Sequence, residues 1–293
     1  MAIPDELDLF HGETTDSYSH IYARWNQPNP DGQLRIVGEI RGPFSDYAQT
    51  LPATFRFTDL GAGETVLARA TVADPCSWTD RLPSTYKVTI QVESPDNPPI
   101  EHEGSVGIRR LGTVQKSFSL DGERWVLRAA DFDPSGVSEG ALKERLREFR
   151  NSLLVCSVRN PGPALLQIAT RLGVFILAKS PVGISRDELH RNLITLSRYP
   201  CVAAAVVSDW PTEGIDRSRM PNLLLGTDRV DAEHDCDFAY LSDEQAANVA
   251  GSKPIVVFRA GEVSDVRELR RQVESLQAKL CPKSLAGYCS VRA

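Results

Sequence analysis

The sequence predicts a multi-domain protein in which an antiparallel β-sandwich is followed by a reduced parallel (β/α)8 barrel. Two changes of pattern along the chain predict this order. Apolar residues alternate with period two at residues 34–92 and recur with a helical period from residue 142 onward. Between residues 152 and 210, three short β-branched runs alternate with two helix-period segments, and such βαβ units form parallel sheets. A chain of 293 residues is long enough for both cores.

The first domain is predicted by short alternating segments with no helical segment between them. These segments lie at residues 34–40, 54–57, 66–70 and 86–92. Turn-forming clusters separate them, and the pattern is typical of an immunoglobulin-like β-sandwich. We assign this domain to residues 34–115. Residues 1–33 are polar and predict a loosely held arm, in which residues 21–25 are the one candidate strand.

The second domain, residues 116–293, is predicted to be a compact TIM-type barrel. Asp121 and Gly122 stand between alternating apolar positions and predict a two-residue hairpin at its entrance. Eight buried strands are predicted at residues 125–130, 153–158, 174–177, 202–207, 223–225, 238–241, 255–258 and 285–289. Capping-box patterns at 185–188 and 242–245 each predict a helix start. The barrel is shorter than the usual ~250 residues, because the segments after the fourth and fifth strands are too short or too polar for full helices.

Composition favours a cytoplasmic protein without a nucleic-acid or membrane partner. The net charge is −6, and the basic residues are interspersed with acids on helix-period segments, whereas phosphate binding requires concentrated positive charge. Neither a signal peptide nor a membrane-spanning run is recognisable. The six cysteines lie far apart without a C-x-x-C pair, which favours free thiols over a zinc site or a disulfide framework. No cofactor motif is present.

Four segments in a fixed order resemble glycoside hydrolase family 2, the β-galactosidase and β-glucuronidase group. They are D-P-C-S-W at 74–78 with the strand L-P-S-T-Y-K-V-T-I-Q-V at 82–92, G-I-R-R at 107–110, F-S-L-D-G-E-R-W-V-L-R at 118–128, and the helix, strand and helix at 142–173. In that family a sandwich ends in G-F-R and leads into the barrel through a hairpin. The resemblance covers residues 34–293 and implies the same two-domain order.

The resemblance also implies where a catalytic site would lie, and there the sequence departs from the family. The family's arginine and histidine after the second strand fall on Cys156 and Arg159. Its acid/base pair after the fourth strand, Asn-Glu, falls on Asp209 and Trp210. Its nucleophile at the seventh strand falls on Arg259.

Neither an indole nor a guanidinium can do the work of those two carboxylates. We therefore expect a non-catalytic relative, a pseudoenzyme with a binding or scaffolding role in which carbohydrate is the candidate ligand. The alternative is an active retaining β-glycosidase that uses displaced carboxylates, Asp209 and Glu262. The family's N-x-H segment after the first strand falls on Asp131 and Asp133.

Ligand-lining candidates follow from the strand ends, where barrels bind ligands. They are Asp131, Asp133, Arg159, Asp209, Trp210, Asp228 and Arg259. Acids at these ends, including Asp243, could hold a divalent cation, but solvated caps and turns explain them better, and we expect no metal. The barrel has no final helix, so we expect the apolar surface near Val291 to be covered by self-association or by residues 1–30.

Overall fold

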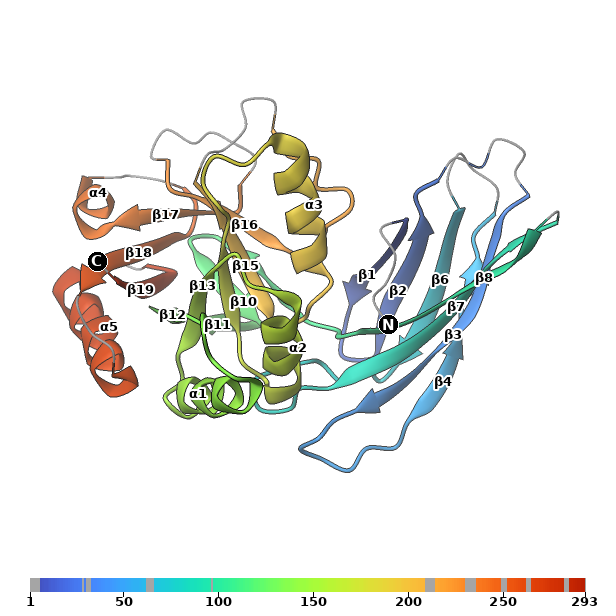
Figure 1. Cartoon of the computed structure of the whole chain (residues 1–293), viewed down its shortest axis with the longest axis horizontal. Helices are drawn as coiled ribbons and strands as arrows, with labels where there is room; N and C mark the ends of the chain where they lie inside the picture. Colours follow the sequence, from blue (N-terminus) through green and yellow to red (C-terminus); the bar gives the residue numbers. More distant parts are fainter. Residues whose placement is uncertain are drawn as a thin grey trace. The chain divides into compact units, whose positions relative to one another are not determined.

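The computed structural model describes residues 6–27, 29, 33–61, 66–95, 97–208, 214–229, 236–248, 252–261, 265–281 and 285–292. The chain divides into two compact units (Figure 1). Unit 1 comprises Met1–Arg109 with Ser218–Asn222, and unit 2 comprises Arg110–Arg217 with Leu223–Ala293. The short segment Ser218–Asn222 therefore belongs to unit 1, although the chain on both sides of it belongs to unit 2.

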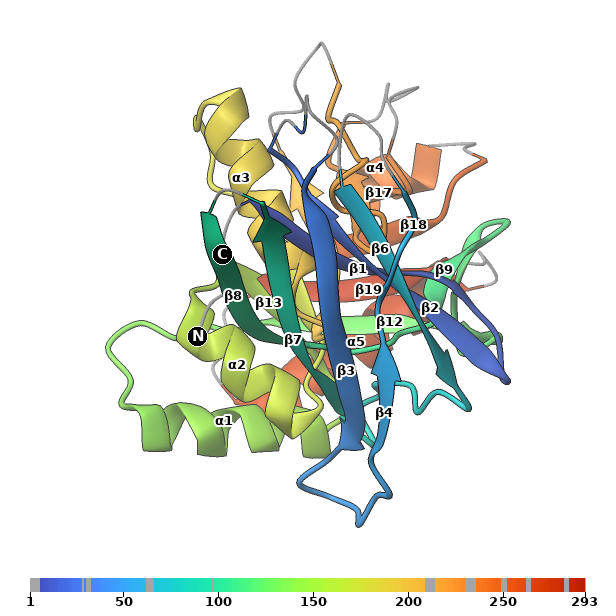
Figure 2. The same ribbon diagram turned by 90° about the vertical axis from the view of Figure 1, so that its right-hand side faces the viewer.

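Unit 1 is built from two four-stranded antiparallel sheets. The first has the order β1 (Leu7–Thr14), β2 (Tyr18–Trp25), β6 (Val66–Ala73) and β5 (Thr58–Asp59). The second has the order β4 (Ala53–Arg56), β3 (Arg35–Phe44), β7 (Thr85–Ser94) and β8 (Asn97–Val106) (Figure 2). Side chains from both sheets, among them Ile21, Ala68, Ile40 and Ile90, form one buried cluster. The two sheets therefore pack face to face as a sandwich.

The prediction of a loosely held arm at residues 1–33 is wrong for the residues that the structure describes, because they form β1 and β2. Leu7 and Ile21 are fully buried, and the residues between the buried positions point to the other side of the sheet. The strand expected at 21–25 is the second half of β2.

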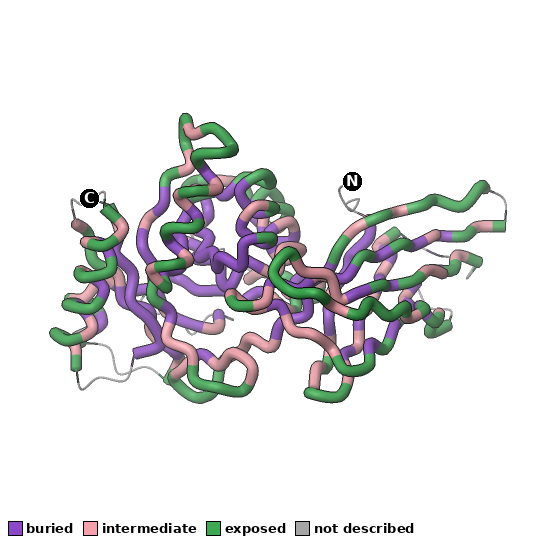
Figure 3. Tube along the Cα trace, turned by 90° about the horizontal axis from the view of Figure 1, so that it is seen from below, coloured by how far each residue is buried: buried purple, intermediate pink, exposed green. Residues whose placement is uncertain are grey.

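Unit 2 contains the predicted barrel. Eight parallel strands close on themselves in chain order: β12 (Leu127–Asp131), β13 (Val155–Arg159), β14 (Ile176–Lys179), β15 (Val202–Val207), β16 (Leu224–Thr227), β17 (Phe238–Ser242), β18 (Ile255–Gly261) and β19 (Gly287–Arg292). All eight predicted strands are thus confirmed within a few residues. They account for much of the buried chain in Figure 3, and all six residues of β15 are buried.

A three-stranded hairpin sheet of β9 (Leu111–Val114), β10 (Ser117–Leu120) and β11 (Glu123–Trp125) precedes the barrel. Leu120 pairs with Glu123, so the predicted two-residue turn is confirmed, and Asp121 and Gly122 both have positive φ. Phe118 packs edge-on against Phe238, with 5.4 Å between ring centroids. Trp125 lies 5.0 Å from Phe175. These rings anchor the hairpin to β17 and to the residue before β14.

Five helices accompany the barrel in the described chain: α1 (Glu139–Asn151), α2 (Pro163–Leu172), α3 (Arg186–Ser197), α4 (Asp243–Asn248) and α5 (Val266–Leu280). Ser185 caps α3, and Ser242 exchanges two hydrogen bonds with Gln245 at the start of α4, as the capping boxes predict. The described parts of the segments after β15 and β16 contain no helix.

Helix α5 covers part of the surface that was expected to be bare. Tyr288 of β19 is only 4% exposed and packs with Val273 and Leu276 of α5. Ser290 of β19 donates a hydrogen bond to Gln272 of the same helix, at 2.7 Å. The outer side of β19 at Tyr288 and Ser290 is therefore covered by α5 within unit 2, and self-association stays a prediction.

Candidate functional site

The side chains that face the barrel lumen follow from the strand register. Leu241, Val257 and Tyr288 pack with α5 and therefore face outward. Because side chains alternate along a strand, their neighbours face the lumen. Across the ladders, Cys289 pairs with Ala129, Asp131 with Ser157, and Arg159 with Lys179. The lumen side at the carboxyl ends of the strands, which we call the mouth, thus carries Asp131, Ser157, Arg159, Lys179, Asp228, Tyr240, Phe258 and Cys289.

An ion pair lies at this mouth. Lys179 Nζ donates to Asp131 Oδ1 at 2.8 Å, and the two side chains are 15% and 24% exposed. The second carboxylate oxygen accepts from the backbone N–H of Arg292 at 2.9 Å. The ammonium group also lies 5.7 Å from the centre of the Tyr240 ring. Each carboxylate oxygen of Asp131 therefore accepts a hydrogen bond.

Beneath the ion pair lie buried polar groups of β13, β17 and β19. The hydroxyls of Tyr240 and Ser157 have no hydrogen-bond partner among the described residues. Burial, followed by the neighbouring Cys289, raises the pKa of Tyr240 well above its usual value. Burial likewise raises the pKa of the Cys289 thiol. Tyr240 and Cys289 are thus neutral near pH 7, and both hydroxyls are enclosed by the barrel.

Arg259 lies elsewhere than predicted. It pairs with Ser290, whose hydroxyl bonds to α5, so Arg259 is on the outer side of β18. Its side chain is 47% exposed, and its guanidinium lies 3.4 Å from the carboxylate of Asp243 at the start of α4. Lys279 of α5 holds the same carboxylate at 3.1 Å. Arg259 therefore does not line the lumen; the residues of β18 that do are Phe258 and Ala260.

The other residues predicted to line the site lie at different places in unit 2. Asp133 is exposed and accepts the backbone N–H of Ser135 at 2.9 Å, a turn contact that lowers its pKa. Arg159 ends β13 on the lumen side and is exposed. Asp228 follows β16 and is close enough to influence Tyr240. Asp209, Trp210 and Glu262 lie outside the described residues.

Several mouth residues were not selected from the sequence. Lys179, Ser157, Tyr240 and Cys289 stand at or near predicted strand ends. Counting alternate positions along each predicted strand could have selected them, because every second side chain faces the lumen. The predicted divalent-cation alternative has no support in the described chain, where no group of three His, Cys, Asp or Glu side chains is placed to hold a metal ion.

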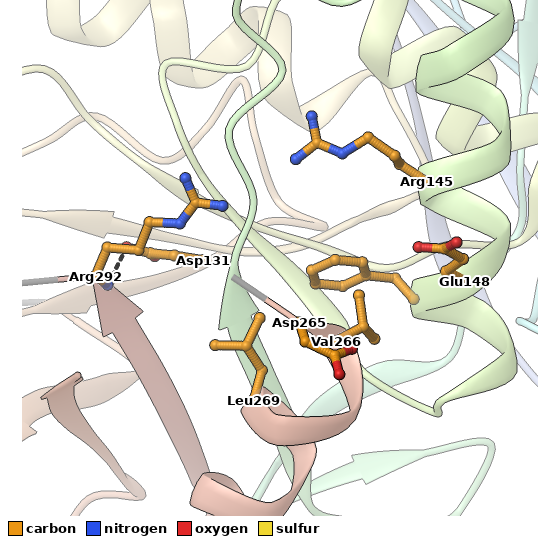
Figure 4. A pocket seen from close by; sticks show the side chains of 8 residues that line it. Asp131, Arg145, Glu148, Asp265, Val266, Leu269 and Arg292 are labelled. Carbon is orange, nitrogen blue, oxygen red and sulfur yellow. Dashed lines mark hydrogen bonds between the residues drawn. The ribbon is translucent and has the colours of Figure 1, made fainter. Parts of the chain in front are cut away.

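A small pocket of about 110 Å³ lies beside the mouth, between α1 and α5 (Figure 4). Its lining comprises Asp131, Arg145, Glu148, Phe149, Asp265, Val266, Leu269 and Arg292. No pattern in the sequence indicates this pocket. Its charges are mixed, and Arg145 also lies 4.8 Å from the centre of the Phe132 ring and donates to Asp133 O. It shows no selective preference for an anion or a cation.

Solved structures that match this chain include glycosidases. The β-glucuronidase of Parabacteroides merdae matches with a TM-score of 0.65 and 14% identity, over 98% of this chain and 47% of its own. The fold is that of family 2 glycoside hydrolases. A β-glucuronidase of Bacteroides uniformis (TM-score 0.65, 13% identity, 98% and 45% coverage) and a family 2 member from Bacteroides cellulosilyticus (0.65, 15%, 98% and 43%) agree.

The family 2 resemblance is thus confirmed at the level of the fold. The chain spans less than half the length of these structures, and identities this low carry no information on activity. The sequence matches no protein-family model and no curated protein. Within the described chain, no helix is long and apolar enough to cross a membrane.

Proposed function

We propose that this protein is a non-catalytic member of the family 2 fold that binds carbohydrate at the mouth of its barrel. The observation that carries the proposal is the lumen side of β18, which presents Phe258 and Ala260 at the strand that would supply a nucleophile. The Phe258 ring stacks on Tyr240 at 4.7 Å between centroids. An aromatic ring there leaves no anion to attack a sugar.

The remaining carboxylate chemistry at the mouth supports the same conclusion. Asp131 is held by Lys179 and by the backbone of Arg292, so its charge is already balanced. Asp131 can accept further hydrogen bonds from a ligand through its remaining lone pairs.

The mouth has the groups that a hydroxyl-rich ligand needs. Lys179 and Arg159 can donate hydrogen bonds, and Asp131 can accept them. Such convergent polar groups above an aromatic ring are typical of small-ligand sites. A sugar is the ligand class that best fits them.

The alternative is an active retaining β-glycosidase that uses Asp209 and Glu262. One observation favours keeping it: Arg259 faces outward, so no guanidinium opposes an oxocarbenium-like charge from that position. We also propose a cytoplasmic protein whose sandwich is immunoglobulin-like, with no nucleic-acid or membrane partner and with homo-oligomerisation as an open candidate.

A combined turnover and binding experiment separates the two functions. The full chain is incubated with chromogenic β-glucuronide, β-galactoside and β-glucoside, alongside Asp209→Asn and Glu262→Gln. In parallel, ligand-observed NMR measures binding of the free sugars to the wild type and to Lys179→Met. We expect no turnover, and sugar binding that Lys179→Met weakens. Turnover abolished by either carboxylate change would establish the glycosidase; absence of both turnover and binding would refute a carbohydrate function.

A further inference from the structure

The long strand β8 lies at an open edge of unit 1. It follows β7 at the end of the order β4-β3-β7-β8, and it pairs with β7 alone (Figure 2). From Ile100, opposite Val92, to Val106, opposite Tyr86, the pairing has no register shift. In the part of the chain that the structure describes, no backbone hydrogen bond is made on its other side. Alternate N–H and C=O groups of residues 100–106 therefore point outward from the sheet.

Exposed edges of this length are usually protected. Natural edge strands are short, bulged, or carry lysine or proline. Here Pro98 and Pro99 protect only the beginning of β8, and the one irregularity of its pairing lies between Val92 and Ser94 of β7. Residues 100–106 remain straight and regular, which is the geometry that an added strand requires.

The side chains along this edge define the partner. On the solvent side, Glu101 and Glu103 are exposed. Glu101 accepts a hydrogen bond from Gln91 of β7 at 2.7 Å, and Glu103 has no hydrogen bond or ion pair with any described residue. On the opposite side, Ile100 is 48% exposed. The edge thus combines two acidic positions on one side with an exposed apolar position on the other.

We propose that β8 binds an extended basic peptide as an additional antiparallel or parallel strand. Lysine or arginine at alternate peptide positions would lie beside Glu101 and Glu103, and an apolar residue between them would lie near Ile100. Opposite charges on neighbouring strands stabilise pairing and like charges oppose it. A second copy of β8 would bring glutamates against glutamates, so self-pairing does not fit this edge. This site is independent of the barrel mouth and of its proposed ligand.

The test compares three peptides of seven residues with the full chain. In the first, lysine alternates with valine and threonine; in the second, glutamate replaces each lysine; the third is the lysine peptide with alternate backbone nitrogens methylated. Fluorescence anisotropy measures affinity, and hydrogen exchange measures protection of the β8 amides. We expect the lysine peptide alone to bind and to slow exchange at residues 100–106.

The second part of the experiment reverses two charges of the protein. The double variant Glu101→Lys/Glu103→Lys should bind the lysine peptide about tenfold more weakly and prefer the glutamate peptide. The matched control Glu39→Lys/Glu93→Lys makes the same change of charge on the inner strands β3 and β7, and its affinity should change by less than about threefold.

Three results would overturn the proposal. They are equal binding of the methylated peptide, an equal loss in the control variant, and no binding of the lysine peptide at millimolar concentration. The peptide comparison uses the wild-type chain, so it remains decisive if a variant fails to fold.

Discussion

The carboxylate of Asp8 organises one edge of unit 1, and its removal should loosen that edge strongly. Asp8 is 3% exposed. It accepts from Arg24 at 3.1 Å, from Asn26 at 2.8 Å, and from two nitrogens of Arg219 at 2.8 Å each. Arg219 belongs to the segment Ser218–Asn222, which comes from between β15 and β16 in the chain. Asp8 thus fixes this segment to β1 and β2 within unit 1.

The cost of Asp8→Asn follows from what it leaves behind. An amide keeps the size of the side chain but cannot balance two guanidinium groups, which are only 19% and 25% exposed. Breaking a buried pair by removing one partner costs ~3–5 kcal/mol, and the partial exposure of both arginines reduces this to about 2–3 kcal/mol. The free energy of local opening of β1 and β2 should fall by that amount.

Hydrogen exchange of the β1 and β2 amides measures this opening without requiring the two units to unfold together. The matched control is Glu274→Gln, which breaks the exposed pair with Arg270 on α5 and should change the local opening energy of α5 by no more than about 0.5 kcal/mol. If Asp8→Asn changes exchange in β1 and β2 as little as the control changes α5, the carboxylate does not hold the edge and the reasoning fails.

The pKa of Asp8 makes the same contact sensitive to acid. Burial alone would raise this pKa, but hydrogen bonds from Arg219, Asn26 and Arg24, together with the charge of Arg219, hold it below its usual value. The resulting stability is present above the unfolded pKa near 3.8 and is lost as the pH falls through the lower folded value. The wild type should therefore lose β1–β2 protection in this acidic range, whereas Asp8→Asn should not show that dependence.

Three other perturbations test the cores of the two units. Burial and the charge of Arg109 lower the pKa of His11 to about 4. The unfolding free energy of unit 1 should therefore fall by up to about 3 kcal/mol between pH 6.5 and pH 4. Urea unfolding measures this, and a His11→Gln variant with the same pH dependence would contradict it. Gly226→Ala should cost about 1–3 kcal/mol, because the new Cβ would lie 2.3 Å from the Phe238 ring, whereas Gly112→Ala has open space and should cost little. Phe118→Ala should cost about 3–5 kcal/mol in urea unfolding, since the ring is 1% exposed; a change below 1 kcal/mol would show that the hairpin does not anchor to the barrel.

The barrel was predictable because its strands are buried on both faces. A run such as Val-Ala-Ala-Ala-Val-Val in β15 has no polar position, so its burial is visible in composition alone. The strands β1 and β2 were missed because polar and aromatic residues alternate with small ones there. In β2, Ser19, Ile21 and Ala23 are buried, whereas Tyr18 and His20 lie on the other side. Hydrogen bonds from distant parts of the sequence also hold β1. Arg219 bonds to Asp8 and Asn222 bonds to His11, and the two members of each pair are 211 residues apart.

The candidate site was only partly predictable for a related reason. A strand end tells which residues are near the mouth, but the direction of each side chain depends on the register, and a shift of one residue reverses it. Asp131 was selected correctly as a strand-end residue, while its partner Lys179 was not selected. Arg259 was placed in the lumen by counting from a motif, and the structure places it beside Asp243 on the outside.

That reversal changes the physical argument about catalysis. If Arg259 faced the lumen, its positive charge would by itself exclude glycosidase activity. Because Arg259 faces outward, the argument against glycosidase activity depends on the side chains that do fill the lumen. Phe258 stacks on Tyr240, and Lys179 lies over the same tyrosine and binds Asp131. Each of these contacts stabilises the barrel by occupying the position, or balancing the charge, that a nucleophile would need. Replacing Phe258 with glutamate would place a carboxylate in an apolar contact, where burial raises its pKa and favours the neutral acid. A single acidic substitution would therefore not restore a nucleophile, and turnover by Phe258→Glu alone would show that the lumen is more open than these contacts imply.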